Sequence, residues 1–211
     1  VSNNGSSQIS NNIRIGVQNG ALDSYTGDGT SGVYIWGAQL EEGSFPTSYI
    51  PTSGSTVTRN QDIFTRDGIG SLINSTEGVL FLEMAALADD GVIKYIVIND
   101  GTTSNILSIN YWNNSTITAR VTISGASTYL FSGAVTQTDF LKIALKWKLN
   151  DYALWINGIE VYSENTLGVF SPNSLTTLDF KRGSNNFYGK VKQLQVYKTA
   201  LTDTQLAALT S

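Results

Sequence analysis

Alternating apolar and polar residues are clearest in the second half of the chain. From Leu141 to Leu149 every second residue is apolar, and the positions between them are Lys or Ala. Successive side chains of a β-strand point to opposite faces, so this pattern predicts a strand with one buried and one wet face. Two turn dipeptides, Asn150-Asp151 and Asn157-Gly158, separate it from apolar runs over 152–156 and 159–162. The segment therefore predicts three consecutive antiparallel strands.

Short apolar runs of this kind recur along most of the chain. They are separated by Asp, Asn and Gly, the residues that tolerate positive φ in tight turns. Thr, Ser and Asn are abundant, with 23, 23 and 18 residues, and this composition favours strands and turns over helices. Further strands are expected over 79–86, 92–99, 105–111, 116–123, 128–132 and 188–197. We therefore expect an all-β fold, an antiparallel sandwich of two sheets.

The last residues of the chain carry a helix signal instead. Thr202 and Gln205 have the spacing of a capping box, in which each side chain bonds the other's backbone N–H. The pattern predicts one short helix from Asp203 to about Leu209.

The first part of the chain is a poorer match to the sandwich pattern. A strand is expected over 33–40, and an extended connector containing Pro46 and Pro51 follows it. We place a domain boundary near Asn60. Residues 1–60 are then interpreted as the C-terminal remnant of an upstream β module plus a linker, and residues 61–211 as the sandwich domain.

Composition excludes several classes of chemistry. The 211 residues include no His and no Cys, so Ser-His-Asp and Cys-His nucleophiles and the usual zinc ligands are absent. The net charge of -4, without a Lys/Arg run, argues against nucleic acid as a partner, and no apolar run is long enough for membrane insertion. Retaining glycosidases need two carboxylates close together, but Glu83, Glu160 and Glu164 form no such run. We therefore expect no enzymatic activity and no required cofactor.

Two parts of the sequence resemble known families. Residues 189–202, preceded by the turn Trp155-Ile156-Asn157-Gly158, are similar to the closing pattern of laminin-G-like, concanavalin A-like jelly-roll domains. The run YIWGAQLEEG at 34–43, with PTSYIP at 46–51, resembles a segment of bacteriophage tail and fibre proteins. In those proteins the segment closes one carbohydrate-binding-like sandwich and leads into the next domain. The resemblance implies a jelly-roll domain of a phage virion protein that faces the host envelope.

These features favour a non-catalytic, lectin-like receptor-binding module of a phage tail fibre that recognises a host cell-surface polysaccharide. Such a protein would be made in the bacterial cytoplasm and carried on the virion beside other virion domains. The resemblance alone favours a homo-oligomer, with a trimer first. A purely structural fibre, tail or capsid-decoration domain is the alternative hypothesis, and a polysaccharide-degrading enzyme is a weaker one.

The hairpin after Leu149 predicts one candidate glycan site. If Asn150-Asp151 is a two-residue turn, Trp147 opposes Leu154 on the apolar face and Lys146 opposes Trp155 on the other face. Trp155 then opposes Glu160 and lies diagonal to Tyr162. A Trp among charged residues either stacks on a ligand or packs against another domain or subunit. The candidate ligand-binding residues are Trp155, Lys146, Glu160 and Tyr162.

A second candidate site lies at a turn. Tyr111, Trp112 and Asn113 adjoin an Asn-Asn turn, where the loops at one end of a sandwich gather. The alternative is a turn whose Trp folds back onto the core. Asp89-Asp90 and Asp100 could ligate calcium through carboxylate oxygens, but their Asp-Gly contexts favour plain turns.

Overall fold

The computed structural model describes residues 26–30, 34–41, 48–58, 64–112 and 115–211. The chain divides into two units, Val1–Thr58 and Arg59–Ser211. In the described part of the first unit, the rings of Trp36 and Tyr49 lie 4.9 Å apart between centroids. Residues 34–41 belong to no β-sheet, and Gly37 among them has a positive φ of 72°, so the strand expected over 33–40 is wrong for the described residues. A strand needs a hydrogen-bonded neighbour, and no described strand pairs with this segment.

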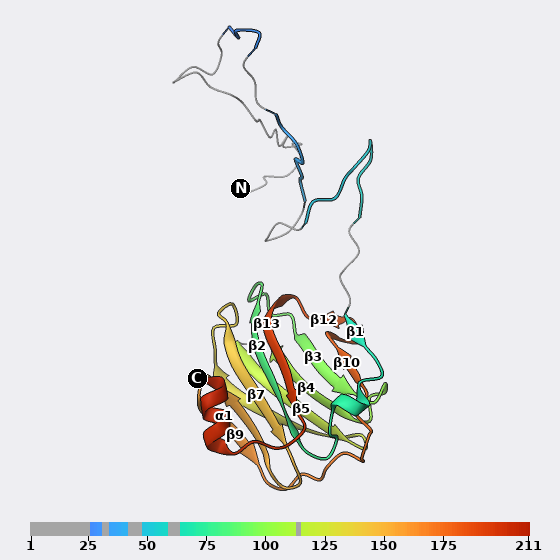
Figure 1. The fold of residues 1–211 in the computed structure, drawn as a ribbon, viewed down its shortest axis with the longest axis vertical. Helices are drawn as coiled ribbons and strands as arrows, with labels where there is room; N and C mark the ends of the chain where they lie inside the picture. Colours follow the sequence, from blue (N-terminus) through green and yellow to red (C-terminus); the bar gives the residue numbers. More distant parts are fainter. Residues whose placement is uncertain (1–25, 31–33, 42–47, 59–63, 113–114) are drawn as a thin grey trace, which may run out of the picture. The chain divides into compact units, whose positions relative to one another are not determined.

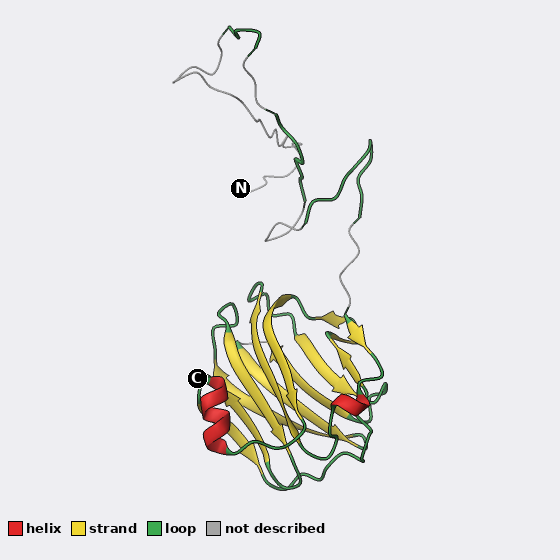
Figure 2. Ribbon diagram, in the orientation of Figure 1, coloured by secondary structure: helices red, strands yellow, loops and turns green. Residues whose placement is uncertain are grey.

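The second unit is a sandwich of two antiparallel sheets (Figures 1 and 2), which confirms the predicted fold. One sheet has the order β1 (Thr65–Arg66), β10 (Thr177–Asp179), β3 (Lys94–Asn99), β4 (Ile106–Trp112), β5 (Thr116–Ile123), β6 (Ala126–Ala134). The other has the order β13 (Gly189–Tyr197), β2 (Gly78–Ala86), β7 (Leu141–Trp147), β8 (Tyr152–Ile156), β9 (Ile159–Glu164). The remaining elements are the 3-10 turn η1 (Gly70–Leu72), the hairpin β11 (Lys181–Arg182) and β12 (Asn185–Asn186), and the helix α1 (Asp203–Thr210).

The main core lies between the two sheets. Every strand from β2 to β8 contributes aliphatic or aromatic side chains to it, and Trp147 is fully buried there. The indole Nε1–H of Trp147 donates to the carbonyl of Asn74 at 3.1 Å, so its polar atom is satisfied. Gly78 faces this ring across the sheet, and a Cβ there would lie 2.5 Å from the indole. Only glycine fits at that position.

A second, smaller core lies on the outer side of the five-stranded sheet. Helix α1 begins with the predicted capping box: Thr202 Oγ1 accepts from the backbone N–H of Gln205, and Thr202 N–H donates to Gln205 Oε1 at 2.9 Å. The helix packs on β7, β8 and β9 (Figure 1). Its Leu206 is buried against Val79, Phe81, Ala144, Ala153 and Trp155. Among the described helices, none is long and apolar enough to cross a bilayer.

The hairpin between β7 and β8 has a longer turn than predicted. Leu145, not Trp147, pairs with Leu154, and Lys146 pairs with Ala153 instead of Trp155. Residues 148–151 form the turn, with Asn150 at a positive φ of 56°. The register differs from the prediction by two residues, and because side chains alternate with a period of two, the residues of β7 and β8 keep their predicted faces.

Candidate functional site

The first candidate site of the sequence analysis is covered by the C-terminal helix. Trp155 pairs with Glu160 as predicted and points away from the main core, but it is only 7% exposed because α1 packs over it. The expectation that Trp155 lies on an open polar face is therefore wrong. Neither alternative open from the sequence, stacking on a ligand or packing against another domain or subunit, describes Trp155, because it packs against the chain's own helix α1.

Lys146 holds the same helix in place. Its ammonium forms ion pairs with Asp151 at 2.6 Å and with Asp203, the first residue of α1, at 3.2 Å. Burial acts to lower the pKa of Lys146, but the hydrogen bonds and charges of the two carboxylates outweigh it, so the pKa lies above its ordinary value. The charge of Lys146 is thus used in ion pairs that stabilise the fold and is not available to a ligand.

Glu160 and Tyr162 do not complete a cluster around Trp155. Glu160 is exposed at its strand, whereas Tyr162 pairs with Leu154 and packs against the main core. A bulge between the two pairs adds a residue to β9, which turns Tyr162 to the core side. The prediction that Tyr162 shares the polar face with Trp155 is therefore wrong.

The second candidate site is split between core and surface. Tyr111 is fully buried, its hydroxyl donates to the carbonyl of Met84 at 2.9 Å, and burial raises its pKa. Placing Tyr111 at an accessible loop end is therefore wrong, because it occupies a core position of β4. Trp112 is half-buried on the opposite face of the strand, and Asn113 lies outside the described residues.

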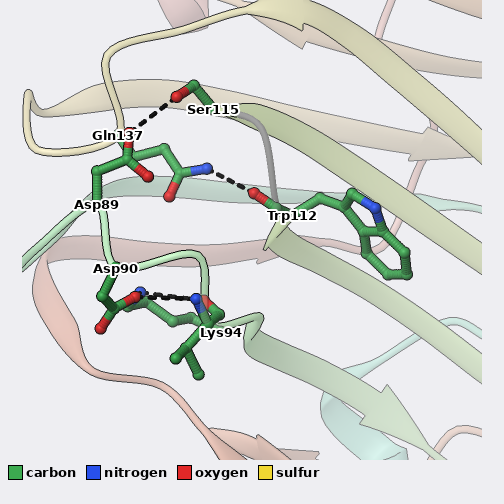
Figure 3. Close-up of polar contacts among 7 residues, drawn as sticks. Asp89, Asp90, Lys94, Trp112, Ser115 and Gln137 are labelled. Atoms are coloured by element: carbon green, nitrogen blue, oxygen red, sulfur yellow. Dashed lines mark hydrogen bonds and ion pairs between the residues drawn. The ribbon is translucent and has the colours of Figure 1, made fainter.

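The loops around Trp112 are tied together by hydrogen bonds (Figure 3). Gln137 Nε2 donates to the carbonyl of Trp112 at 2.7 Å, and Ser115 Oγ donates to Asp89 at 2.8 Å. The side chain of Trp112 points away from these contacts. Its backbone is therefore fixed while its ring is directed to the outer side of the sheet.

The acidic turns use their carboxylates locally. Asp90 pairs with Lys94 at 2.5 Å and accepts the backbone N–H of Val92. Asp100 accepts from Thr102 and Asn105, and these hydrogen bonds outweigh the opposing effect of burial to hold its pKa below the ordinary value. No group of three potential metal ligands exists among the described residues. The turn interpretation accounts for these contacts.

A different surface combines polar and aromatic side chains: the outer face of the six-stranded sheet. Residues of this face alternate along each strand with residues of the main core. On β3 to β6 they are Tyr95, Val97, Asn99, Ile106, Ser108, Asn110, Trp112, Thr116, Thr118, Arg120, Thr122, Ser127, Tyr129 and Phe131. We call this set the outer polar face.

One row across the outer polar face has unused hydrogen-bonding capacity. Strand pairing aligns Tyr95, Asn110, Thr118 and Phe131 on four adjacent strands. Asn110 is 1% exposed and Thr118 is 0% exposed, yet Asn110 Nδ2 and Thr118 Oγ1 have no hydrogen-bond partner. A buried polar atom without a partner costs free energy, so two neighbouring ones on a face that points away from the core are unusual.

Aromatic rings and guanidinium groups surround this row. The Tyr129 ring lies 6.5 Å from Trp112 and 6.1 Å from Phe131, between centroids. Arg120 lies 5.5 Å above the Tyr129 ring, and Arg182, on the hairpin strand β11, lies 5.7 Å from the Tyr95 ring. The face thus joins flat apolar surfaces to hydrogen-bond donors, with Arg cations at both ends.

Sequence reasoning found one residue of this face, Trp112, and missed the rest. The signal was present: in 106–112 and 116–122 polar residues occupy alternate positions between core residues, with Asn110 and Arg120 among them. Pairing of Asn110 with Thr118 depends on strand register, which short apolar runs do not determine.

Solved structures share this fold, although the sequence matches no known protein family and no curated protein. The CBM40 module of the Ruminococcus gnavus IT-sialidase is 15% identical, with a TM-score of 0.57, and the match covers 70% of this chain and 98% of that one. Domain 4 of the GH43 arabinanase AbnA from Geobacillus stearothermophilus, in complex with arabinotriose, is 14% identical (TM-score 0.55; 72% and 82% covered). A heptameric SAP-like pentraxin of Limulus polyphemus is 15% identical (TM-score 0.54; 66% and 71% covered). At these identities the likeness shows a common jelly-roll fold.

Proposed function

We propose that this chain is a non-catalytic glycan-binding module and that it binds sugar on the outer polar face of the six-stranded sheet. One observation carries the proposal: Asn110 and Thr118 are buried, unpaired and adjacent on that face. A ligand that supplies hydroxyl groups would satisfy them when the side chains that cover the two atoms move aside. Satisfying buried polar groups recovers free energy that the free protein lacks.

The aromatic residues around the row fit the same ligand class. A pyranose ring has an apolar face that stacks on aromatic side chains and a rim of hydroxyls that exchange hydrogen bonds. Phe131 is 46% exposed and Trp112 is half-buried, so both offer ring surface beside the polar row. Carbohydrate-binding modules among the structures of the same fold support this assignment.

The described strands of the six-stranded sheet lack the pair of carboxylates that a retaining glycosidase uses. Within the described strands of the six-stranded sheet, Asp179 is the one acidic residue. Its two oxygens accept from Thr65 Oγ1 at 2.6 Å and Asn99 Nδ2 at 2.8 Å. Retaining glycosidases require a second carboxylate about 5 Å away, so this face suits binding without hydrolysis.

We further propose that the module is a receptor-binding domain of a phage tail fibre, carried on the virion as a homo-oligomer beside other virion domains. The resemblance of residues 34–43 and 46–51 to a phage tail segment supports this proposal. The target would be a polysaccharide of the host cell surface. A structural spacer is the competing function, and it predicts no glycan binding.

Binding of the purified chain to a glycan array and to whole cells tests the proposal, with two phenylalanines as a matched pair. Phe131 lies on the outer polar face, whereas Phe140 is 36% exposed and precedes β7 of the other sheet. Phe131→Ala should weaken binding about tenfold, as loss of a stacking aromatic does, and Phe140→Ala should not. Absence of any glycan signal, or equal binding by the two variants, would contradict the proposed function or its site.

A further inference from the structure

The unpaired polar groups of the outer polar face are mainly donors. Asn110 Oδ1 accepts from Ser108 Oγ at 3.5 Å, which leaves the amide Nδ2 without a partner. Arg182 Nε is likewise buried and unpaired, and its guanidinium lies beside Tyr95, the strand partner of Asn110. A hydroxyl such as that of Thr118 can donate or accept, but an amide N–H and a guanidinium N–H only donate. Two of the three unpaired groups, on Asn110 and Arg182, can therefore be satisfied only by an acceptor.

Arg120 on the outer polar face and Arg182 beside it also lack a carboxylate partner. Arg120 donates to Thr122 Oγ1 at 3.0 Å and to Ser127 Oγ at 2.9 Å, which are neutral acceptors. Among the described residues neither Arg120 nor Arg182 forms an ion pair. Asp179, the acidic residue of the same sheet, is engaged by Thr65 and Asn99 instead. Two positive charges thus stand unneutralised in a chain whose net charge is -4.

From these two observations we infer that the outer polar face selects acidic saccharides, sugars that carry a carboxylate group. This inference rests on the proposed glycan-binding function and specifies its ligand class. The carboxylate would accept hydrogen bonds from the Asn110 amide and from Arg182, with Arg120 adding charge. The aromatic rings would contact the apolar part of the sugar.

Hydrogen-bond energetics distinguish an acidic sugar from a neutral one at this face. Charge-assisted bonds from guanidinium to carboxylate are about twice as strong as neutral ones and can be bidentate. A neutral hydroxyl accepts from Nε but leaves both positive charges without a counter-charge. Local positive potential in an acidic protein also concentrates anions at the face that carries it.

The test is an array that carries uronic acid glycans and sialic acid glycans, each beside its carboxyl-reduced form, probed with the full chain. The two acidic arms separate the two sources of a sugar carboxylate. We expect the acidic form of at least one arm to bind about tenfold or more tightly than its reduced form, as one charged hydrogen bond provides. The advantage should shrink as salt is raised, because exposed charges are screened.

Arginine variants test whether the preference for acidic glycans depends on this face. Arg182→Gln removes the charge and the unpaired Nε without breaking a described hydrogen bond, so the fold should be retained. It should abolish the preference for the acidic form, and Arg182→Lys should keep part of it. Arg66→Gln makes the same charge change at an exposed position of β1 and serves as the control. Thermal unfolding of each variant checks that the domain remains folded.

The possible results distinguish a failure of the acidic preference from a failure of the proposed glycan-binding function. Equal binding of acidic and reduced glycans, with Phe131→Ala still weakening both, would overturn the acidic preference and leave the glycan-binding function standing. A preference that survives Arg182→Gln and Arg120→Gln would also overturn it. If the array and the whole cells both give no binding, the proposed function fails and the inference fails with it.

Discussion

The outer faces of the two sheets differ in the side chains they carry and in what covers those side chains. On the five-stranded sheet the outward residues under the helix are apolar, including Phe81 and Trp155, and α1 covers them. On the six-stranded sheet the outward residues mix polar side chains such as Asn110 with aromatics such as Tyr129, and no described helix covers them. The apolar outer face is buried by the chain's own helix, whereas the outer polar face keeps exposed aromatic surface, such as that of Phe131.

Polar satisfaction differs between the faces as well. Three of the five described buried polar atoms without partners lie on the outer polar face or beside it: those of Asn110 and Thr118 on the face, and that of Arg182 next to Tyr95. On the outer face of the five-stranded sheet, Lys146 forms two ion pairs and anchors helix α1, although Trp155 Nε1 remains unpaired. Polar groups with hydrogen-bond partners contribute to stability. Unpaired polar groups gathered on one face indicate where a bound partner could supply the missing hydrogen bonds and stabilise the protein.

The largest expected effect compares two tryptophans on opposite outer faces. Trp155→Ala should lower the free energy of unfolding by about 3 kcal/mol, because it removes a buried aromatic and opens a cavity under α1. Trp112→Ala should cost only about 1 kcal/mol, because the ring is half-buried. Urea denaturation measures both losses.

Binding should reverse the order of the same two variants. Glycan affinity should drop for Trp112→Ala and stay unchanged for Trp155→Ala, since only Trp112 lies on the outer polar face. A larger loss of stability for Trp112→Ala would mean that the six-stranded sheet, not the helix-covered one, depends on its outer aromatics. The comparison of the two faces would then be wrong.

Much of the fold could be predicted from local pattern. Strict alternation in Leu141–Leu149 predicted β7 and which of its side chains face the main core, although the face predicted to be wet is buried under α1. The spacing of Thr202 and Gln205 predicted the cap of α1. Both signals act over a few residues, where sequence and structure are closely linked. The face of Trp155 was also predicted correctly, even though the turn was two residues longer than expected.

The candidate site could not be predicted in the same way, because it depends on contacts between distant segments. Nothing in residues 141–162 indicates that α1 returns to cover Trp155, since this requires packing across about fifty residues. The bulge that turns Tyr162 inward is likewise invisible in a run of alternating residues. The proximity of Arg182 to Tyr95 arises from the hairpin β11–β12, whose four paired residues carry no strong strand signal.

A smaller effect is expected from two threonines of β5 that share the outer polar face. Thr122 Oγ1 accepts from Arg120 and exchanges a hydrogen bond with Ser127 at 3.0 Å, so Thr122→Val should cost about 1 kcal/mol. Thr118 Oγ1 is unpaired, so Thr118→Val should leave stability unchanged or raise it by up to about 1 kcal/mol.

Glycan affinity again separates the pair. Thr118→Val should weaken binding, because it removes a group that a ligand would satisfy, and this variant would then be more stable but less active. Denaturation and array binding of the two variants provide the comparison. If Thr118→Val destabilises the domain as much as Thr122→Val, the hydroxyl of Thr118 is already satisfied in the free protein.

The smallest expected effect concerns the attachment of α1 at alkaline pH. The pKa of Lys146 in the folded chain lies above its ordinary value of 10.5, because the hydrogen bonds and charges of Asp151 and Asp203 outweigh burial. A raised pKa means that the charged lysine stabilises the folded state fully below the unfolded pKa. That stabilisation is lost as the pH rises through the folded pKa.

The wild type should therefore exceed Lys146→Gln in unfolding free energy by a constant amount from pH 7 to 9. The difference should shrink above about pH 10.5, by less than about 1 kcal/mol, as expected for pairs with partly exposed carboxylates. Lys148→Gln, which removes one exposed lysine from the same turn, should show no such pH-dependent difference. A gap between wild type and Lys146→Gln that persists unchanged to pH 11.5 would show that Lys146 holds the helix by packing of its aliphatic stem and not by its charge.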